Sequence, residues 1–369
     1  MHVCFVSDTL SAYFLESNPS SVGGAERQQY LIANELRRGG INVSVATRTH
    51  ESKKQQRIDG IDLWHVIPDV RGLPRAPYKA LRTMHGLHKI NADIYYVRGN
   101  DFLCIATGTY AELTDRDFVY AVANDANVDP TLLKDLGFVR HLYVKAMKSA
   151  DQVIAQTNKQ QELLQDKHGI DAVQIPNGYS IPDSGEIIAH TDRDYVLWVG
   201  SMDPEQKHPE RFLRLAEEFP ETQFVMIGPP DNDLPEHYET IEREANNVPN
   251  LEFLGFVDPH EIHDYYQRAI ALVNTSDYEG FPNVFLEAWR YATPVISLYH
   301  SLDGILNKEP VGIHAGSMEN LVDALEQILT DNSLQKELGE GGRGYMIANY
   351  SFEKLINEYK NVFEEVMRT

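Results

Sequence analysis

The sequence is poor in cysteine and in long apolar runs, and each shortage excludes a class of protein. Its 369 residues include only two cysteines, Cys4 and Cys104, and both lie in apolar runs. We expect reduced core thiols there, and neither a disulfide nor a metal pair. No run approaches the roughly twenty apolar residues that a membrane-spanning helix needs. The chain opens on a strand-like run without the basic start and cleavage site of a signal peptide, which predicts a cytoplasmic protein.

Basic residues are also scarce: 33 Lys and Arg stand against 55 Asp and Glu, a formal net charge of −22. Such a chain repels phosphate backbones, so no nucleic acid is expected as a partner. Residues 70–92 are an exception, because they contain no acidic side chain and apolar residues recur there at helical spacing from Tyr78 to Leu87. The cations of 71–89 fit either a basic amphipathic helix at the inner face of an anionic membrane or a crossover helix with solvated cations.

Short β-rich runs alternate with helical periods along the chain, which predicts an α/β fold with parallel sheets. A helix is expected over Ala25–Arg38, ended by Gly39. The turn-rich segment 175–185 ends the first unit. We therefore expect two doubly wound, Rossmann-like domains with the ligand in the cleft between them. The expected strands are 2–7, 41–47, 61–66, 93–98, 118–123, 152–155, 172–175, 195–200, 223–227, 251–254, 271–274 and 294–297.

The most informative segment is 276–288, where an apolar strand run ends and a helical period begins. Pro282 and Asn283 stand at the expected helix start. Free backbone N–H groups and the helix dipole favour an anion there, and Gly280 lets the backbone approach a phosphate closely. The segment therefore predicts a phosphate site at the head of this helix.

Two glutamates, Glu279 and Glu287, flank that turn. Glu287 is one turn into the expected helix, where it can reach sugar hydroxyls beside a phosphate. Glu279 is on the loop, where a carboxylate can face a reacting centre. These positions suit a nucleotide-sugar diphosphate better than a bare nucleotide, although two solvated acids beside a helix cap remain the alternative.

Two further loops join a strand to a helix. Residues 20–27 include Gly23 and Gly24, which suit either a loop close to a ligand or a flexible turn. Residues 200–207 end in Lys207, which can neutralise a phosphate or simply be solvated.

Taken together and in this order, the motifs resemble the retaining glycosyltransferases of the GT-B fold, family four, over nearly the full length. Residues 22–27 resemble that family's Gly-Gly-x-Glu-Arg loop, and 175–178 its Pro-Asn-Gly segment. Residues 279–287 have the spacing of its Glu-x7-Glu motif, and 293–296 resemble the Thr-Pro segment that follows.

The resemblance implies domain limits and an activity. Residues 1–176 plus 352–369 would form the acceptor-side domain, to which the final helix returns, and 177–351 would bind the nucleotide-sugar donor. The enzyme would move a sugar to a hydroxyl of a glycan or lipid-linked acceptor, with retention and without a metal or other cofactor.

The resemblance also implies roles for single residues. Glu279 would contact the donor sugar and stabilise the oxocarbenium-like transition state, Glu287 would hold the ribose, and Lys207 would bind the diphosphate. The other donor-binding positions implied are Gly23, Gly24, Gly200, Ser201, Gly280, Phe281, Pro282 and Asn283.

The chain departs from the family pattern at two functional positions. Ser201 stands where the family usually has Arg, and Arg211 is the candidate substitute. The usual His that approaches the donor sugar is absent, so Asn124 or Asp125 would take its place as a catalytic residue; Asn can hydrogen-bond but carries no charge. These departures leave open a catalytically silent subunit that supports an active partner, and a nucleotide-sugar epimerase or hydrolase is a further alternative.

Overall fold

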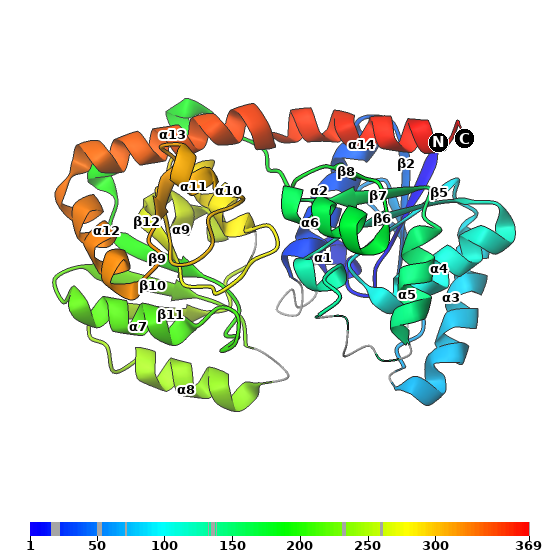
Figure 1. The fold of residues 1–369 in the computed structure, drawn as a ribbon, viewed down its shortest axis with the longest axis horizontal. Coiled ribbons are helices and arrows are strands. Elements are labelled where there is room, and N and C mark those ends of the chain that lie inside the picture. The colour runs from blue at the N-terminus through cyan, green and yellow to red at the C-terminus, as the bar shows by residue number, and fades with distance from the viewer. Residues whose placement is uncertain are drawn as a thin grey trace. The chain divides into compact units, whose positions relative to one another are not determined.

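The computed structural model describes residues 1–15, 23–49, 54–70, 72–131, 133, 137, 139–230, 234–258 and 261–368. The chain forms two compact units. Unit 1 comprises Met1–Asn177 and Glu353–Thr369, and unit 2 comprises Gly178–Phe352. Each unit has its own sheet and its own helices (Figure 1), as the alternation of strand and helix patterns predicted.

Unit 1 contains an eight-stranded sheet in the order β3-β4-β2-β1-β5-β6-β7-β8. Its strands are β1 His2–Val6, β2 Asn42–Arg48, β3 Gln55–Ile58, β4 Ile61–Ile67, β5 Ile94–Arg98, β6 Asp117–Ala121, β7 Gln152–Ala155 and β8 Ala172–Gln174. All neighbours are parallel except β3 and β4, which pair antiparallel. The sequence did not predict β3, because this edge strand has no buried apolar face.

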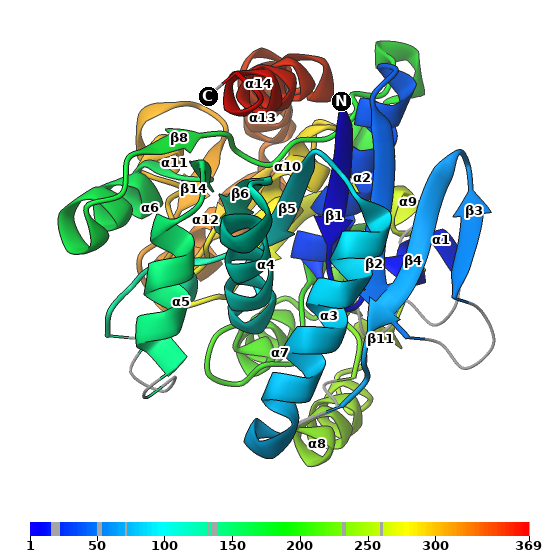
Figure 2. The ribbon, with the colours of Figure 1, turned by 90° about the vertical axis from the view of Figure 1, so that its right-hand side faces the viewer.

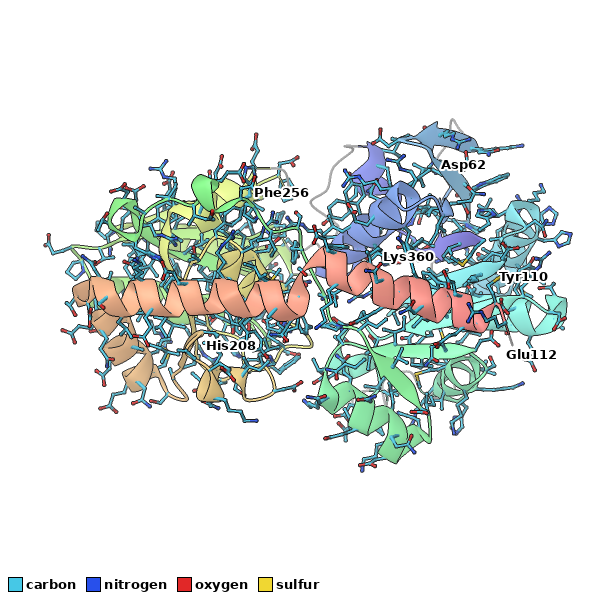
Figure 3. All side chains as sticks on the ribbon, turned by 90° about the horizontal axis from the view of Figure 1, so that it is seen from above. Asp62, Tyr110, Glu112, His208, Phe256 and Lys360 are labelled. Carbon is cyan, nitrogen blue, oxygen red and sulfur yellow. The ribbon has the colours of Figure 1, made fainter. Side chains whose placement is uncertain are left out.

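The helices of unit 1 are α1 Ser11–Leu15, α2 Gly24–Arg38, α3 Ala76–Ile90, α4 Asp101–Thr114, α5 Val139–Lys148, α6 Asn158–Leu163 and α14 Phe352–Val366. Helix α2 ends at Gly39, as predicted. Helices α3, α4 and α5 lie side by side on one face of the sheet (Figure 2). Helix α14 packs on β5, where the ring of Tyr96 contacts Tyr359 and Phe363. Lys360 of α14, labelled in Figure 3, reaches the end of α2 at Gly39.

Unit 2 contains a six-stranded parallel sheet in the order β11-β10-β9-β12-β13-β14. Its strands are β9 Tyr195–Val199, β10 Gln223–Ile227, β11 Leu251–Gly255, β12 Ala269–Asn274, β13 Val295–Ser297 and β14 Gly312–His314. Its helices are α7 Pro209–Glu218, α8 Pro235–Ala245, α9 Ile262–Arg268, α10 Asn283–Trp289, α11 Ile305–Lys308, α12 Met318–Thr330 and α13 Asn332–Tyr350. The sequence missed β14, which is only three residues long.

Helix α13 contacts α10 through glycines. A Cβ added at Gly342 would lie 2.2 Å from Cδ1 of Trp289, at the end of α10. A Cβ added at Gly339 would lie 2.1 Å from the carbonyl oxygen of Ala292. Real Cβ atoms do not approach other atoms so closely, so any side chain at these two positions would displace the end of α10.

Cys4 and Cys104 are free and fully buried, as predicted. They belong to the apolar core of unit 1, in which Tyr95 and Tyr120 are also completely buried. Within the part of the chain that the structure describes, no helix is both long enough and apolar enough to cross a bilayer.

Candidate functional site

The order of the second sheet determines where its loops meet. Strand β9 lies between β10 and β12, so the chain leaves β9 toward one edge of the sheet and returns to its other side. In open α/β sheets, this reversal of strand order creates a crevice at the carboxyl ends of the strands. Strands β9 and β12 are parallel, with Leu197 beside Leu272, so the loops that follow them leave from the same edge. Residues 200–208 and 275–282 therefore meet, although they are far apart in the sequence.

An ion pair joins these two loops. The Nζ of Lys207 lies 2.6 Å from Oε1 of Glu279. The Glu279 side chain is 7% exposed and that of Lys207 is 21% exposed, so the pair is shielded from water. The same carboxylate oxygen also accepts hydrogen bonds from Oγ of Ser276 at 2.7 Å and from Nδ2 of Asn274 at 3.2 Å. Glu279 is thus held in one orientation by three donors.

These donors keep Glu279 ionised despite its burial. Burial alone would raise the pKa of this carboxyl, since it penalises the charged form. The charge and hydrogen bond of Lys207, the hydroxyl of Ser276 and the charge of His300 act in the opposite direction. The net result is a pKa below the ordinary glutamate value, so Glu279 is a carboxylate at neutral pH.

Backbone contacts fix the spacing of the two loops. The hydroxyl of Thr275 donates to the carbonyl of Lys207 at 2.7 Å, and the amide of Asp277 donates to the carbonyl of Gln206 at 2.9 Å. The indole of Trp198, at the end of β9, donates to the same Thr275 hydroxyl at 2.8 Å. The position of Lys207 relative to Glu279 is therefore built into the main chain.

Arg211, the candidate substitute for the missing Arg at position 201, contacts the loop that carries Glu279. Its Nη1 lies 2.5 Å from Oδ1 of Asp277 and donates to the carbonyl of Thr275 at 2.9 Å. Its guanidinium also stacks on the ring of Tyr299, 5.4 Å from the centroid. Arg211 thus braces the loop that carries Glu279. Ser201 itself is exposed, and the amide of Gly200 donates to the carbonyl of Ile227.

The run from Gly280 to Asn283 connects Glu279 to α10. Phe281 is buried and meets the ring of Tyr350 edge to face at 5.4 Å, while Pro282 precedes the first residue of the helix. Glu287 is only 4% exposed and lies among the apolar residues that follow Asn283 in this helix. The structure therefore places both glutamates inside unit 2 and turns neither into bulk water.

The glycines of the first loop lie at the start of α2. Gly23 precedes the helix, and its amide donates to Oε2 of Glu26 at 3.2 Å. The other oxygen of Glu26 accepts from the Thr9 hydroxyl at 3.0 Å. Glu26 thus ties the start of α2 to the segment after β1, and Gly23 and Gly24 stay exposed. Residues 20–22 of this loop lie outside the described residues.

Asn124 and Asp125 differ sharply in what they touch. Asp125 is 8% exposed and pairs with Nζ of Lys159 at 2.6 Å, and it accepts from Nε2 of Gln160 at 3.1 Å. The side chain of Asn124 is exposed. Asn127 supports this turn by accepting the amides of Ala123 and Asn124. Only Asn124 of the two candidates presents its side chain to solvent.

Several residues of this site were not predicted from the sequence. Asn274 and Ser276 orient Glu279, and Asp277 and His208 join its loop to that of Lys207. One signal was available, because Asn274 and Ser276 are polar residues at the end of an apolar strand run. Among the residues that the structure describes, no three His, Cys, Asp or Glu side chains gather as metal ligands would.

Family models match both halves of the chain. A model described as Glycosyl transferases group 1 matches residues 183–345, and a model described as Glycosyltransferase Family 4 matches residues 22–181. The match to the Rhizobium meliloti lipopolysaccharide core biosynthesis glycosyltransferase LpsE is 23% identical and covers 48% of this chain and 52% of that protein. The match to an uncharacterized glycosyltransferase of Haemophilus influenzae is 19% identical over 95% of this chain and 98% of that protein.

Solved structures share the fold over the full chain. A sucrose-phosphate synthase from Thermosynechococcus elongatus matches with a TM-score of 0.78 at 17% identity, over 100% of this chain and 99% of that one. Anabaena HepE, solved in complex with UDP and glucose, matches with a TM-score of 0.75 at 14% identity, over 99% of this chain and 100% of that one.

Proposed function

The chain belongs to the family-four glycosyltransferases of the GT-B fold, and from this we propose that it transfers a sugar from a nucleotide-sugar donor to a hydroxyl of a glycan or lipid-linked acceptor. We propose further that transfer retains the anomeric configuration and needs no metal or other cofactor. The observation that carries the proposal is the shielded pair of Lys207 and Glu279, where the two loops at the switch point of the second sheet meet.

In the proposed reaction, the donor separates this pair. Lys207 exchanges its contact with Glu279 for the diphosphate oxygens, which carry more charge, and the amides at the start of α10 supply further donors. Glu279 is then left facing the sugar, where its negative charge stabilises the oxocarbenium-like transition state. Glu287 holds the ribose hydroxyls. A lysine and a helix start would neutralise the leaving group in place of a metal.

The bonds change as follows. The bond between the anomeric carbon and the diphosphate oxygen breaks, and its electron pair stays with the phosphate. The acceptor hydroxyl forms a new bond to that carbon on the same face. Its proton passes to the departing phosphate oxygen, so Glu279 contributes charge and no proton transfer.

Unit 1 would supply the acceptor side, and unit 2 the donor side. Gly23 and Gly24 would lie beneath the diphosphate and the acceptor. We assign the hydrogen bond to the donor sugar to Asn124, since its side chain is exposed, while Asp125 holds the turn through Lys159 and Gln160.

Thermal denaturation with UDP, GDP and ADP tests the proposal. One nucleotide should stabilise the protein by about 2.7 kcal/mol at a hundred times its dissociation constant. Glu287→Gln should weaken that effect, because it removes the charge from the ribose ligand. Glu340→Gln, which changes an exposed glutamate on α13, should leave it intact. If no nucleotide raises the melting temperature, the chain is not a donor-binding enzyme, and a catalytically silent subunit becomes the better hypothesis.

We also propose that α3 contacts an anionic membrane surface at the inner face of the membrane. Tyr78 is 55% exposed and Leu81 is 68% exposed, beside the exposed cations Arg75 and Arg82. Helix α5, beyond α4 on the same face of the sheet, has no acidic residue either and carries Arg140, Lys145 and Lys148 (Figure 2). Exposed apolar side chains among cations are what an anionic bilayer surface attracts, at about 1 kcal/mol per cation.

Two residues of the basic stretch do not support this surface. Lys79 pairs with Oδ2 of Asp8 at 3.2 Å and lies over the ring of Phe102, so its charge faces the protein. Arg71 lies outside the described residues. Co-sedimentation with phosphatidylglycerol vesicles should therefore be lost on changing Leu81→Ser together with Arg82→Glu. Ile347→Ser, at an exposed apolar residue on α13 of unit 2, should sediment like the unchanged protein. Equal binding by all three proteins would contradict the membrane contact.

A further inference from the structure

His208 has an unusual backbone conformation for its residue type. It lies between the loop after β9 and helix α7, with φ 51° and ψ 58°, in the left-handed region. Residues with a Cβ adopt this conformation at a cost in free energy, and such residues persist where the surrounding structure enforces them. Here the amide of His208 donates to the carbonyl of Asp203 at 3.1 Å, and the ring makes further contacts (His208 is labelled in Figure 3).

Both ring nitrogens of His208 face carboxylates. Nε2 lies 2.9 Å from Oδ2 of Asp277, and Nδ1 lies 2.9 Å from Oε1 of Glu210. A neutral imidazole carries only one N–H, so one of its nitrogens would turn a lone pair toward a negatively charged oxygen. Only the imidazolium can donate to both. Both contacts are therefore favourable together only when the ring carries two N–H protons.

The charges around the ring come from both elements packed against it. Helix α7 supplies Glu210 and Arg211, and the loop after β12 supplies Asp277. Arg211 donates a hydrogen bond to the other oxygen of Asp277 and is the main cause of the lowered pKa of that carboxyl. His208 lowers the same pKa to a smaller extent. Asp277 therefore stays ionised across the range in which an imidazole titrates. With Lys207 and Glu279 adjacent, the proton on His208 balances a cluster that has three carboxylates.

The contact of His208 with Asp277 spans the same two loops as the ion pair of Lys207 with Glu279. His208 follows Lys207 directly, and Asp277 precedes Glu279 by two residues. When the imidazole loses its proton, one of its two contacts becomes repulsive, and the tie between the loops weakens next to the proposed diphosphate ligand.

We propose that His208 is a positioning residue that makes donor binding depend on its protonation. In the imidazolium form, it ties Asp277 to Glu210 and holds Lys207 and Glu279 in place for the diphosphate. Donor binding is then stronger while the ring carries both N–H protons than after it has lost one. This inference rests on the function proposed above, because it concerns the same site.

Titration calorimetry with the nucleoside diphosphate that stabilises the unchanged protein tests the inference between pH 5.5 and pH 8.5. The nucleotide itself titrates in this range, so the comparison is with His208→Asn, which tolerates the left-handed backbone but cannot change charge. The unchanged protein should lose about fivefold to tenfold more affinity than this variant as the pH rises, which is the lower end of the usual coupling between sites. Control variant His263→Asn, an exposed histidine, should follow the unchanged protein.

A second variant covers the case in which His208→Asn fails to fold. Glu210→Gln leaves the backbone of residue 208 unchanged and removes one of the two carboxylates, so it should also flatten the dependence on pH. Parallel affinity profiles for the unchanged protein and either folded variant would overturn the role of His208. Absence of nucleotide binding at every pH would instead count against the proposed function itself.

Discussion

The ammonium of Lys207 lies 2.6 Å from the carboxylate of Glu279, so the proposed diphosphate ligand and the proposed stabiliser of the transition state neutralise each other in the protein without donor. The hydroxyl of Ser276 and the side-chain amide of Asn274 donate hydrogen bonds to the same oxygen of Glu279. Binding of the proposed donor would therefore replace an existing ion pair. Removing Lys207 and removing Glu279 should then have different effects on stability, nucleotide affinity and turnover.

Removing the cation should destabilise the protein as well as weaken binding. Lys207→Met leaves Glu279 buried without its counter-ion, and breaking a buried pair costs roughly 3–5 kcal/mol. We expect the lower end of this range, because Ser276 and Asn274 still donate to the carboxylate. Chemical denaturation measures the loss, and Lys336→Met, an exposed lysine, is the control. A variant as stable as the unchanged protein would show that the pair is not shielded.

Neutralising the acid should separate turnover from binding. Glu279→Gln keeps the size of the side chain and frees Lys207 from its counter-ion, so nucleotide affinity should be retained or increased. Loss of one group that stabilises developing charge lowers kcat by about 10²–10³-fold. Steady-state kinetics with the donor identified by stabilisation measures both constants. Equal losses in affinity and kcat would instead indicate a ligand of the ground state.

The stability of the protein should fall on mild acidification because of His190. Burial first, and then the charges of Arg193 and Lys336, lower the pKa of His190 to about 4. The unfolded chain, with its ordinary histidine pKa, binds the proton more readily, so this contribution to stability is complete above about pH 6.5 and is lost as the pH falls toward 4. His190→Gln should reduce the slope of unfolding free energy against pH in this interval. If the slope is the same in His190→Gln as in the unchanged protein, groups other than His190 take up the protons on unfolding.

The guanidinium of Arg193 should be important for the stability of unit 2. It is 7% exposed and donates to the carbonyls of Ala269 and Tyr291 and to the hydroxyl of Thr293. Arg193→Lys cannot reach all three acceptors, and each hydrogen bond to a charged group is worth about 1.5–3 kcal/mol. The melting temperature should drop by several degrees. Arg268→Lys, at an exposed pair with Asp194, provides the comparison and should change it little.

Most of the fold follows from the burial of its strands. Parallel strands covered on both faces appear as short continuous apolar runs, and every expected run became a strand within a few residues. The two strands that were not predicted lack such a continuous apolar run. Strand β3 alternates between exposed and half-buried residues at the sheet edge, and β14 is too short for any period to be visible.

Single residues of the candidate site could be predicted from the sequence, but the contacts between them could not. Glu279, Glu287 and Lys207 could be singled out because each lies beside a strand-to-helix turn. Their mutual contacts depend on β12 lying beside β9, a choice of strand order that no local pattern encodes. For the same reason, no local pattern could show that Arg211, the candidate substitute for the missing Arg, pairs with Asp277.

The glycines of α13 set a limit on how this site can be altered. Trp289 and the carbonyl of Ala292 rest against Gly342 and Gly339 with no room for a methyl group. Any side chain at these two positions would therefore displace Trp289 or the main chain just after α10, the helix that carries Glu287. Attempts to fit a bulkier or smaller donor should therefore change the loops around the site and keep Gly339 and Gly342 of α13 as they are.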